Sequence, residues 1–199
     1  MRQHGILPDH CRVYREEGYI LNLHGYRVRF QEIDAVRSSH AVSVREWYET
    51  SVGSGMYINV ELKRNLPAHT ILLTKNIRSY LKIFLRKHFG DYKEIGLVSP
   101  RFMNQFMVYS TDPIEARVAF HPAFIEKFME IAARLRAVSV EASFLRDKLL
   151  IHGRYKKDLF QLGHFWRPLR IEDIEILMEE LTLYADIIET LRLNPYTAP

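Results

Sequence analysis

Cysteine is almost absent from this sequence, whose 199 residues include only Cys11. A single cysteine excludes an intramolecular disulfide framework, and no Cys/His spacing resembles a structural zinc site. We therefore expect a protein of a reducing compartment, with no bound metal and no cofactor.

Long apolar runs are also missing. The N-terminal stretch MRQHGILPDHCRVYREEGY has no apolar core of signal-peptide length, and the chain nowhere has the run of about 18 apolar residues that a spanning helix needs. We expect a soluble, cytoplasmic protein, with peripheral attachment to the inner membrane left open.

The usual catalytic motifs are absent too: there is no Gly-rich phosphate loop, no GxSxG elbow and no HExxH. Asp9, His10 and Cys11 follow one another, but adjacent residues of an extended chain point to opposite sides. These absences favour a non-catalytic protein, and we assign no catalytic residue.

What is present fits one domain over residues 1–199, strand-rich over 1–75 and helix-rich over 76–199. Hydrophobic residues make up 47% of the chain, and the formal net charge is +4, too small to argue for nucleic-acid binding. Charge is segregated along the chain. Residues 60–93 carry eight basic and two acidic residues, whereas 171–193 carry seven acidic and one basic residue.

Alternation of apolar and polar residues predicts an antiparallel meander in the first part of the chain. The predicted strands are YRVRF, with Val28 and Phe30 inward; MYINVELK; HAVSVREWYE around Val42 and Val44, paired with MYINVELK; and HTILLT after a turn at Pro67. Two further short strands are expected at residues 95–98 and in FMVYS, and a later hairpin is expected over 138–151, turning at Arg146-Asp147.

Three main helices are expected to pack on this sheet, at residues 76–89, 113–136 and 171–193, which makes the fold class α+β. Asp112 with Pro113, and then Pro122, predict two helix starts in quick succession. The last helix has an apolar seam from Ile174 to Leu191 that either packs on the domain or joins a partner helix or a second copy.

The first of these helices has a basic face formed by Arg78, Lys82, Arg86 and Lys87. Such a face either is solvated while the helix docks on its own domain or contacts a membrane surface.

Two places could hold a ligand. Arg117 lies between apolar neighbours, so we expect a partly covered guanidinium that needs an acidic partner or an anionic ligand; His121 is close by. The second place is the loop with Lys156, Lys157 and Asp158, which mixes cations with aromatic residues. The same loop could equally be a plug that packs Leu159, Phe160 and Trp166 under the last helix, and we prefer this structural interpretation.

Several segments together resemble a known family. FMVYSTDPIEARVAFHPAFIEKF, VEASFLRDKLLI, KKDLF, FWRP and IEDIEILMEELTLYADIIETLRL follow in the order and spacing of a bacterial domain family of unknown function, over about residues 15 to 193. Many members resemble membrane proteins with transmembrane helices before this domain, sometimes encoded near LemA-type proteins. No catalytic residue is established for the family, so the resemblance implies a fold and a non-enzymatic role.

We therefore expect a non-catalytic binding or scaffold module of a bacterial cytoplasmic or cell-envelope system. One alternative is a hydrolase-type enzyme with a site near Arg117, His121 and Asp158. Another is a peripheral binder that uses the basic helix over 75–87 on a membrane surface, with nucleic acid the less favoured target.

Overall fold

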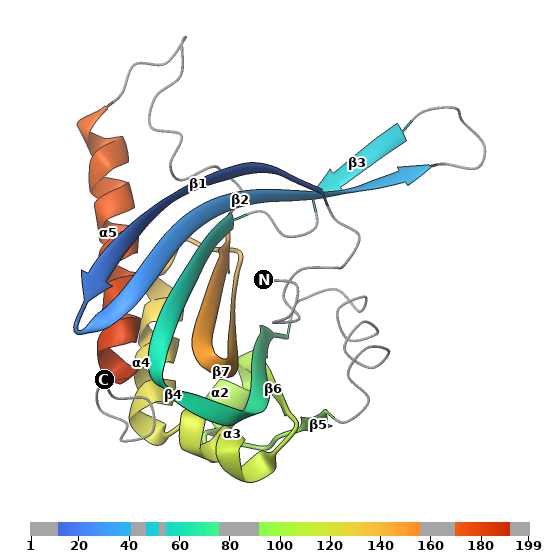
Figure 1. Cartoon of the computed structure of the whole chain (residues 1–199), viewed down its shortest axis with the longest axis vertical. Coiled ribbons are helices and arrows are strands. Elements are labelled where there is room, and N and C mark those ends of the chain that lie inside the picture. The colour runs from blue at the N-terminus through green and yellow to red at the C-terminus, as the bar shows by residue number, and fades with distance from the viewer. Residues whose placement is uncertain (1–11, 41–46, 52–54, 76–91, 156–169, 192–199) are drawn as a thin grey trace.

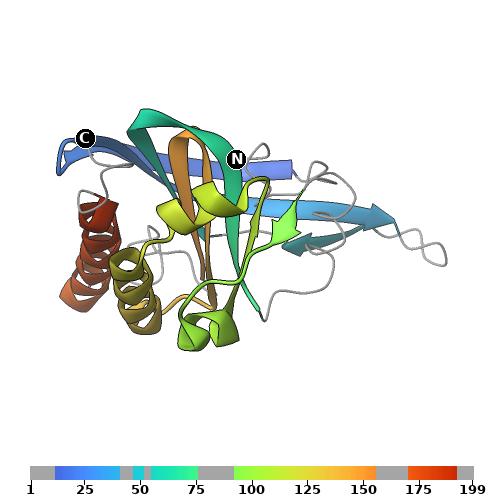
Figure 2. The same cartoon turned by 90° about the horizontal axis from the view of Figure 1, so that it is seen from below.

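The computed structural model describes residues 12–40, 47–51, 55–75, 92–155 and 170–191. This part of the chain forms one seven-stranded antiparallel sheet with four helices packed on one face (Figures 1 and 2), which confirms the α+β class. The strands are β1 (Arg12–Leu23), β2 (Tyr26–His40), β3 (Trp47–Ser51), β4 (Gly55–Thr74), β5 (Lys93–Glu94), β6 (Phe106–Ser110) and β7 (Ser139–Arg154). The helices are α2 (Pro100–Gln105), α3 (Pro113–Ala119), α4 (Pro122–Arg134) and α5 (Ile171–Thr190).

The β1–β2 hairpin forms one edge of the sheet. Its two turn residues, His24 and Gly25, have φ of 51° and 85°, the left-handed conformation of a tight hairpin turn. Val28 and Phe30 are buried while Arg27 and Arg29 are exposed, as their alternation predicts. This part of β2 therefore has an apolar face on the core and a cationic face on the opposite side of the sheet.

Two long strands, β4 and β7, form the middle of the sheet, and each folds back on itself. β7 turns at Arg146-Asp147, and Val138 N–H donates to the Arg154 carbonyl at 2.7 Å, so the predicted hairpin is confirmed. The first part of β4 pairs with residues 148–154 of the hairpin, and its last part pairs with residues 142–144. β4 thus passes around the tip of the hairpin near Leu66, as Figure 1 shows.

Some strand predictions are wrong. β3 pairs with β2 at His40↔Trp47, whereas the sequence predicted pairing with MYINVELK; residues 41–46 lie outside the described part. Partner choice is non-local, so alternation in one segment does not determine it. Residues 95–98 are not a strand: the ladder with β6 covers only Lys93 and Glu94, and beyond it the Ile95 N–H donates to the Val108 carbonyl.

The predicted helix starts are confirmed. Ser99 caps α2, and the Asp112 carboxylate accepts from the N–H groups of Ile114 and Glu115 to cap α3. Pro122 is in the first turn of α4. The helix expected over 113–136 is therefore two helices, and the one expected over 76–89 lies outside the described residues.

The helices share one core with the sheet. Phe124, Phe128 and Ile131 of α4 and Tyr184 and Ile188 of α5 pack with strand residues in one buried cluster. No helix in the described part of the chain combines the length and the apolar character that crossing a bilayer requires.

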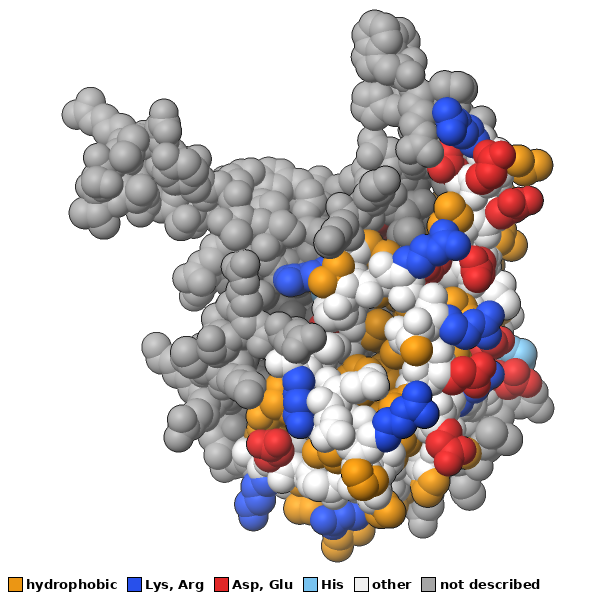
Figure 3. All heavy atoms as spheres, turned by 180° about the vertical axis from the view of Figure 1, so that it is seen from behind, with side chains coloured by type: hydrophobic (Ala, Val, Ile, Leu, Met, Phe, Trp, Pro, Cys, Tyr) orange, Lys and Arg blue, Asp and Glu red, His pale blue; other side chains and the backbone are white. Residues whose placement is uncertain are grey.

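The apolar seam of α5 is buried in this core from Leu177 to Leu191, with Leu181 half-buried, whereas Ile174 is exposed. Acidic side chains gather along the α5 margin when the molecule is seen from behind (Figure 3). The homodimer through this helix stays a prediction.

Candidate functional site

Arg117 is not the partly covered cation that the sequence suggests. It is exposed, and its Nη1 donates to the Pro113 carbonyl at 3.4 Å, one turn back on α3. The buried face of this short helix consists of Ala116 and Ala119. The expectation of a covered guanidinium is therefore wrong, because the helix turns this side chain to solvent.

His121 lies at the N-terminal cap position of α4 and is half-buried. Burial lowers the pKa of its imidazole, and its Nε2 has no hydrogen-bond partner within the described residues. Neither His121 nor Arg117 lines any of the three pockets found in the described part. These three pockets therefore do not join the two residues.

The remaining predicted binding residues cannot be placed. Lys156, Lys157 and Asp158 lie outside the described residues, as do the basic helix positions Arg78, Lys82, Arg86 and Lys87. Their roles stay predictions.

Two histidines of the sheet form buried contacts with other polar groups. His152 Nδ1 lies 2.7 Å from Glu141 Oε2 between the two arms of β7, and the His152 ring stacks on Tyr57 at 4.2 Å. His69 Nε2 lies 2.8 Å from Ser143 Oγ, and its Nδ1 contacts the Tyr92 hydroxyl, whose pKa burial raises to about 12.

An imidazole beside a serine or a carboxylate is the arrangement of many nucleophilic and acid–base sites. Ser143 is fully buried, however, and Glu141 and His152 are each only 4% exposed. None of these three pockets is lined by these residues. Their contacts hold the sheet strands together.

A third polar cluster joins β7 to α5. The Tyr155 hydroxyl donates to Glu180 Oε2 at 2.6 Å and lies 3.0 Å from the Tyr184 hydroxyl, while Arg136 N–H donates to Glu180 Oε1 at 3.0 Å. Burial is the largest cause that raises the pKa of both tyrosines, and the Glu180 carboxylate raises it further. The cluster satisfies a buried carboxylate and is structural.

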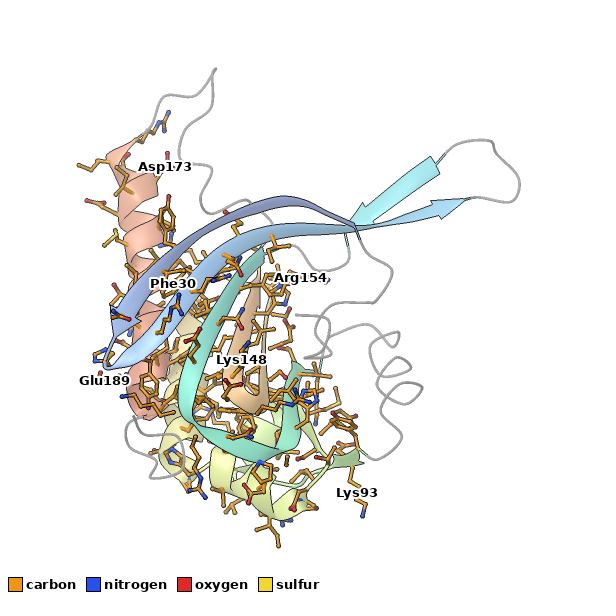
Figure 4. The ribbon with its side chains drawn as sticks, in the orientation of Figure 1. Phe30, Lys93, Lys148, Arg154, Asp173 and Glu189 are labelled. Carbon is orange, nitrogen blue, oxygen red and sulfur yellow. The ribbon has the colours of Figure 1, made fainter. Side chains whose placement is uncertain are left out.

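One open site on the described part of the sheet is a cationic cleft of about 280 Å³. Its lining residues come from β1, β2, β4 and the β7 hairpin: Ile20, Arg27, Arg29, Asn59, Val60, Glu61, Leu145, Arg146, Asp147 and Lys148. Four of them are cationic and two are anionic, so the cleft has a net charge of +2 (4 minus 2). In Figure 4, Lys148 lies on the β7 hairpin within the curve of β4.

Strand register brings these side chains together. Arg27 is paired with Glu61, which is also paired with Lys148, and Arg29 is paired with Asn59. Side chains at paired positions share one face of a sheet, so both arginines and Lys148 project from the same face. This face is opposite the one that Val28 and Phe30 pack against the helices.

Most of these cations are not neutralised within the described residues. Arg27 has a half-exposed ion pair with Glu61 at 3.7 Å, which contributes at most about 1 kcal/mol. Arg29, Arg146 and Lys148 have no ion pair or hydrogen bond with a described residue. Three cations without an ion pair among the described residues therefore border one cleft beside Glu61 and Asp147, and the net charge of its described lining attracts an anion.

Arg146 supports this interpretation. Its φ of 56° is the left-handed conformation, which a residue other than glycine adopts at a cost of about 1–2 kcal/mol. Asparagine or glycine would suit this turn position better. Strained residues of this kind are enriched at functional sites.

The cleft can bind but offers little chemistry. Guanidinium groups recognise the oxygens of phosphates and carboxylates through paired hydrogen bonds, and an ammonium adds a point charge. Among the described residues that line the cleft there is no histidine, cysteine or serine. In the described residues, no group of three or more His, Cys, Asp or Glu side chains could hold a metal ion.

Sequence reasoning missed the cleft, although YRVRF carried a signal: its alternation places Arg27 and Arg29 on one face. The other contributors come from two distant segments, which only the strand pairing brings near.

Comparison with solved structures finds the mycobacterial trehalose monomycolate transport factor A, with 12% sequence identity. The alignment covers 94% of this chain and 89% of that one, with a TM-score of 0.46. No curated protein matches the sequence closely enough to count as a relative. A family model described as "Protein of unknown function (DUF3137)" matches residues 52–193, most of the chain and the whole of its sheet core from β4 onward. The chain therefore belongs to the DUF3137 family.

Proposed function

We propose that this protein is a non-catalytic binding module and that the cationic cleft holds its ligand, an anion bearing phosphate or carboxylate oxygens. The observation that carries the proposal is the convergence of Arg29, Arg146 and Lys148 on one cleft, without an ionic partner among the described residues. Unpaired cations at the mouth of a concave site raise the local concentration of anions and orient them.

The buried polar groups favour binding over catalysis. The imidazoles of His69 and His152 both contact polar side chains inside the sheet, away from the cleft. The described lining of the cleft has charge and hydrogen-bond donors but no nucleophile paired with a base. This arrangement therefore favours binding of an anion over catalysis.

Calorimetric titration with inorganic pyrophosphate at low salt tests the proposal. We expect the double variant Arg29→Gln/Lys148→Gln to bind at least about tenfold more weakly than the wild type, since charge-assisted hydrogen bonds contribute about 1.5–3 kcal/mol each. The matched control is Lys127→Gln/Arg134→Gln, which removes the same charge from α4, where both side chains lie near Glu130.

The control should bind like the wild type. If the cleft variant and the control bind pyrophosphate equally, or if the wild type does not bind at low salt, the cleft is not an anion site.

A further inference from the structure

The N-terminal end of α5 projects from the helix layer. None of its residues before Leu177 is buried, and in Figure 1 this end of the helix extends beyond the β1 strand. Ile171, Ile174 and Met178 are 69%, 38% and 57% exposed. Their spacings of three and four residues place them in one stripe along the helix. Single exposed apolar side chains need no explanation, whereas three neighbours on one helix face indicate a contact surface.

A second, acidic stripe lies beside the apolar one. Glu172, Glu175 and Glu179 are exposed and have the same spacings of three and four residues. The helix macrodipole accounts for an acidic residue in the first turn, but not for Glu175 and Glu179. Glu179 has an ion pair with Arg136 at 3.3 Å, whereas Glu172 and Glu175 have none with a described residue.

The charge of this helix end is strongly negative. Residues 170–179 carry one basic and four acidic residues, a net charge of −3 (1 minus 4). Figure 3 shows acidic and apolar side chains interleaved there. The helix end therefore has the chemistry to dock on a cationic surface.

The cationic cleft has the complementary charge. Its described lining has a net charge of +2, and Arg29, Arg146 and Lys148 have no ion pair with a described residue. α5 packs on the core face of the sheet and the cleft opens on the opposite face, so the helix end of one molecule does not reach its own cleft. A second copy of the chain can supply it.

Resting on the proposed function, we infer that the anion in the cleft is a carboxylate of a second copy, and that the projecting end of α5 of one molecule docks in the cleft of the next. Glu172 and Glu175 pair with the cations, since guanidinium groups recognise carboxylates through paired hydrogen bonds. Ile20 and Leu145 of the cleft lining contact the apolar stripe.

Two different surfaces form this contact, so it is heterologous. Each pair of molecules keeps one unoccupied cleft and one unoccupied helix end, and further copies add head to tail. The contact is small and polar, which is typical of weak, reversible association.

Sedimentation equilibrium of the full chain over a range of concentrations tests this inference. At about 0.05 M salt we expect the average mass of the wild type to rise with concentration above the mass of the monomer, and at about 1 M salt we expect only monomer. Saturating pyrophosphate should also give monomer, because it occupies the cleft.

Two variants remove one surface each. Arg29→Gln/Lys148→Gln alters the cleft, and Glu172→Gln/Glu175→Gln alters the helix end. Each variant alone should self-associate at least about tenfold more weakly than the wild type. Mixed together they should form one-to-one dimers, because the intact helix end of the cleft variant docks in the intact cleft of the helix variant. The helix variant should bind pyrophosphate like the wild type, which also shows that it is folded.

The matched control is Glu126→Gln/Glu189→Gln. It removes the same charge from exposed positions of α4 and of the C-terminal end of α5. Figure 4 labels Asp173 near the projecting end of α5 and Glu189 at the other end. The control should self-associate like the wild type.

The outcomes distinguish this inference from the proposed function. Association that survives either variant, that mixing the variants does not restore, or that the control weakens equally would overturn the inference and leave the anion site standing. A monomeric wild type would also overturn it: binding of polyglutamate would then indicate another acidic protein, and binding of pyrophosphate alone a small anion. A wild type that neither associates nor binds pyrophosphate would overturn both.

Discussion

At the scale of single residues, Tyr155 shows how much one buried hydroxyl contributes. It donates to Glu180, which is 2% exposed, and contacts the Tyr184 hydroxyl. Without this donor, one oxygen of a buried carboxylate would lose its hydrogen bond, at a cost of about 1–3 kcal/mol.

We therefore predict that Tyr155→Phe lowers the free energy of unfolding by about 1–3 kcal/mol, measured by urea denaturation. Ile114→Ala, which truncates a 71% exposed side chain of α3, is the control and should stay within about 0.5 kcal/mol of the wild type. Equal stability of the two variants would show that the hydroxyl of Tyr155 is not needed.

His121 gives a prediction about pH. Burial lowers its pKa in the folded state below the ordinary value of 6.5. As pH falls, the unfolded chain takes up the proton first, so the contribution of His121 to stability is full above about pH 6.5 and is lost as pH falls through the folded pKa.

We predict that His121→Gln reduces the loss of stability between about pH 7 and about pH 5, measured by urea denaturation across that range. His24→Asn, at the exposed turn of the first hairpin, should leave the slope as it is in the wild type. A wild-type slope in the His121 variant would contradict the argument.

Residue by residue, the sequence predicted caps better than contacts. The prediction that Asp112 caps a helix is confirmed, because a cap depends only on the next three residues. The prediction that the Arg117 guanidinium is covered is wrong, because the apolar neighbours of Arg117 in sequence lie on other faces of the helix.

At the scale of elements, the packing of α5 on β7 depends on a glycine. A Cβ on Gly153 would lie 1.8 Å from the Tyr184 hydroxyl oxygen and 3.0 Å from a ring carbon of Tyr155. The helix can approach the hairpin this closely only because residue 153 has no side chain.

We predict that Gly153→Ala lowers the free energy of unfolding by about 1–3 kcal/mol through overpacking. Tyr184→Phe removes the clashing oxygen. The double variant should therefore lose less free energy of unfolding than the two single variants lose together. Urea denaturation of the wild type, both single variants and the double variant measures this difference. Strict additivity would mean that the clash with Tyr184 is not the cause.

Elements whose signals are local were predicted: the turn at Arg146-Asp147, the two helix starts and the long last helix. Pairings were not. The partner of β3, the position of β5 and the return of β4 around the hairpin depend on residues far away in sequence. The cleft also depends on distant pairings, because segments of four strands line it and only their register brings the side chains together.

At the scale of the whole molecule, charge lies on two different sides. The cations of the cleft project from the sheet face away from the core, whereas acidic residues line the exposed side of α5, which packs on the other face (Figures 2 and 3). These described charges favour an approach in which the cleft faces an anionic surface and α5 faces away from it, because charges act over about a Debye length.

The path of β4 around the β7 hairpin has a consequence for synthesis. Gly55 pairs with Arg154, so the inner edge of β4 has its partner only after the ribosome has added the entire middle of the chain. Until then one edge of β4, the edge opposite β2, has no partner in the nascent chain, and an unpaired edge rich in apolar residues is a template for aggregation. Domains built on such distant pairings also fold slowly. We therefore expect the nascent chain to be most prone to aggregation in the interval before the β7 hairpin has been synthesised.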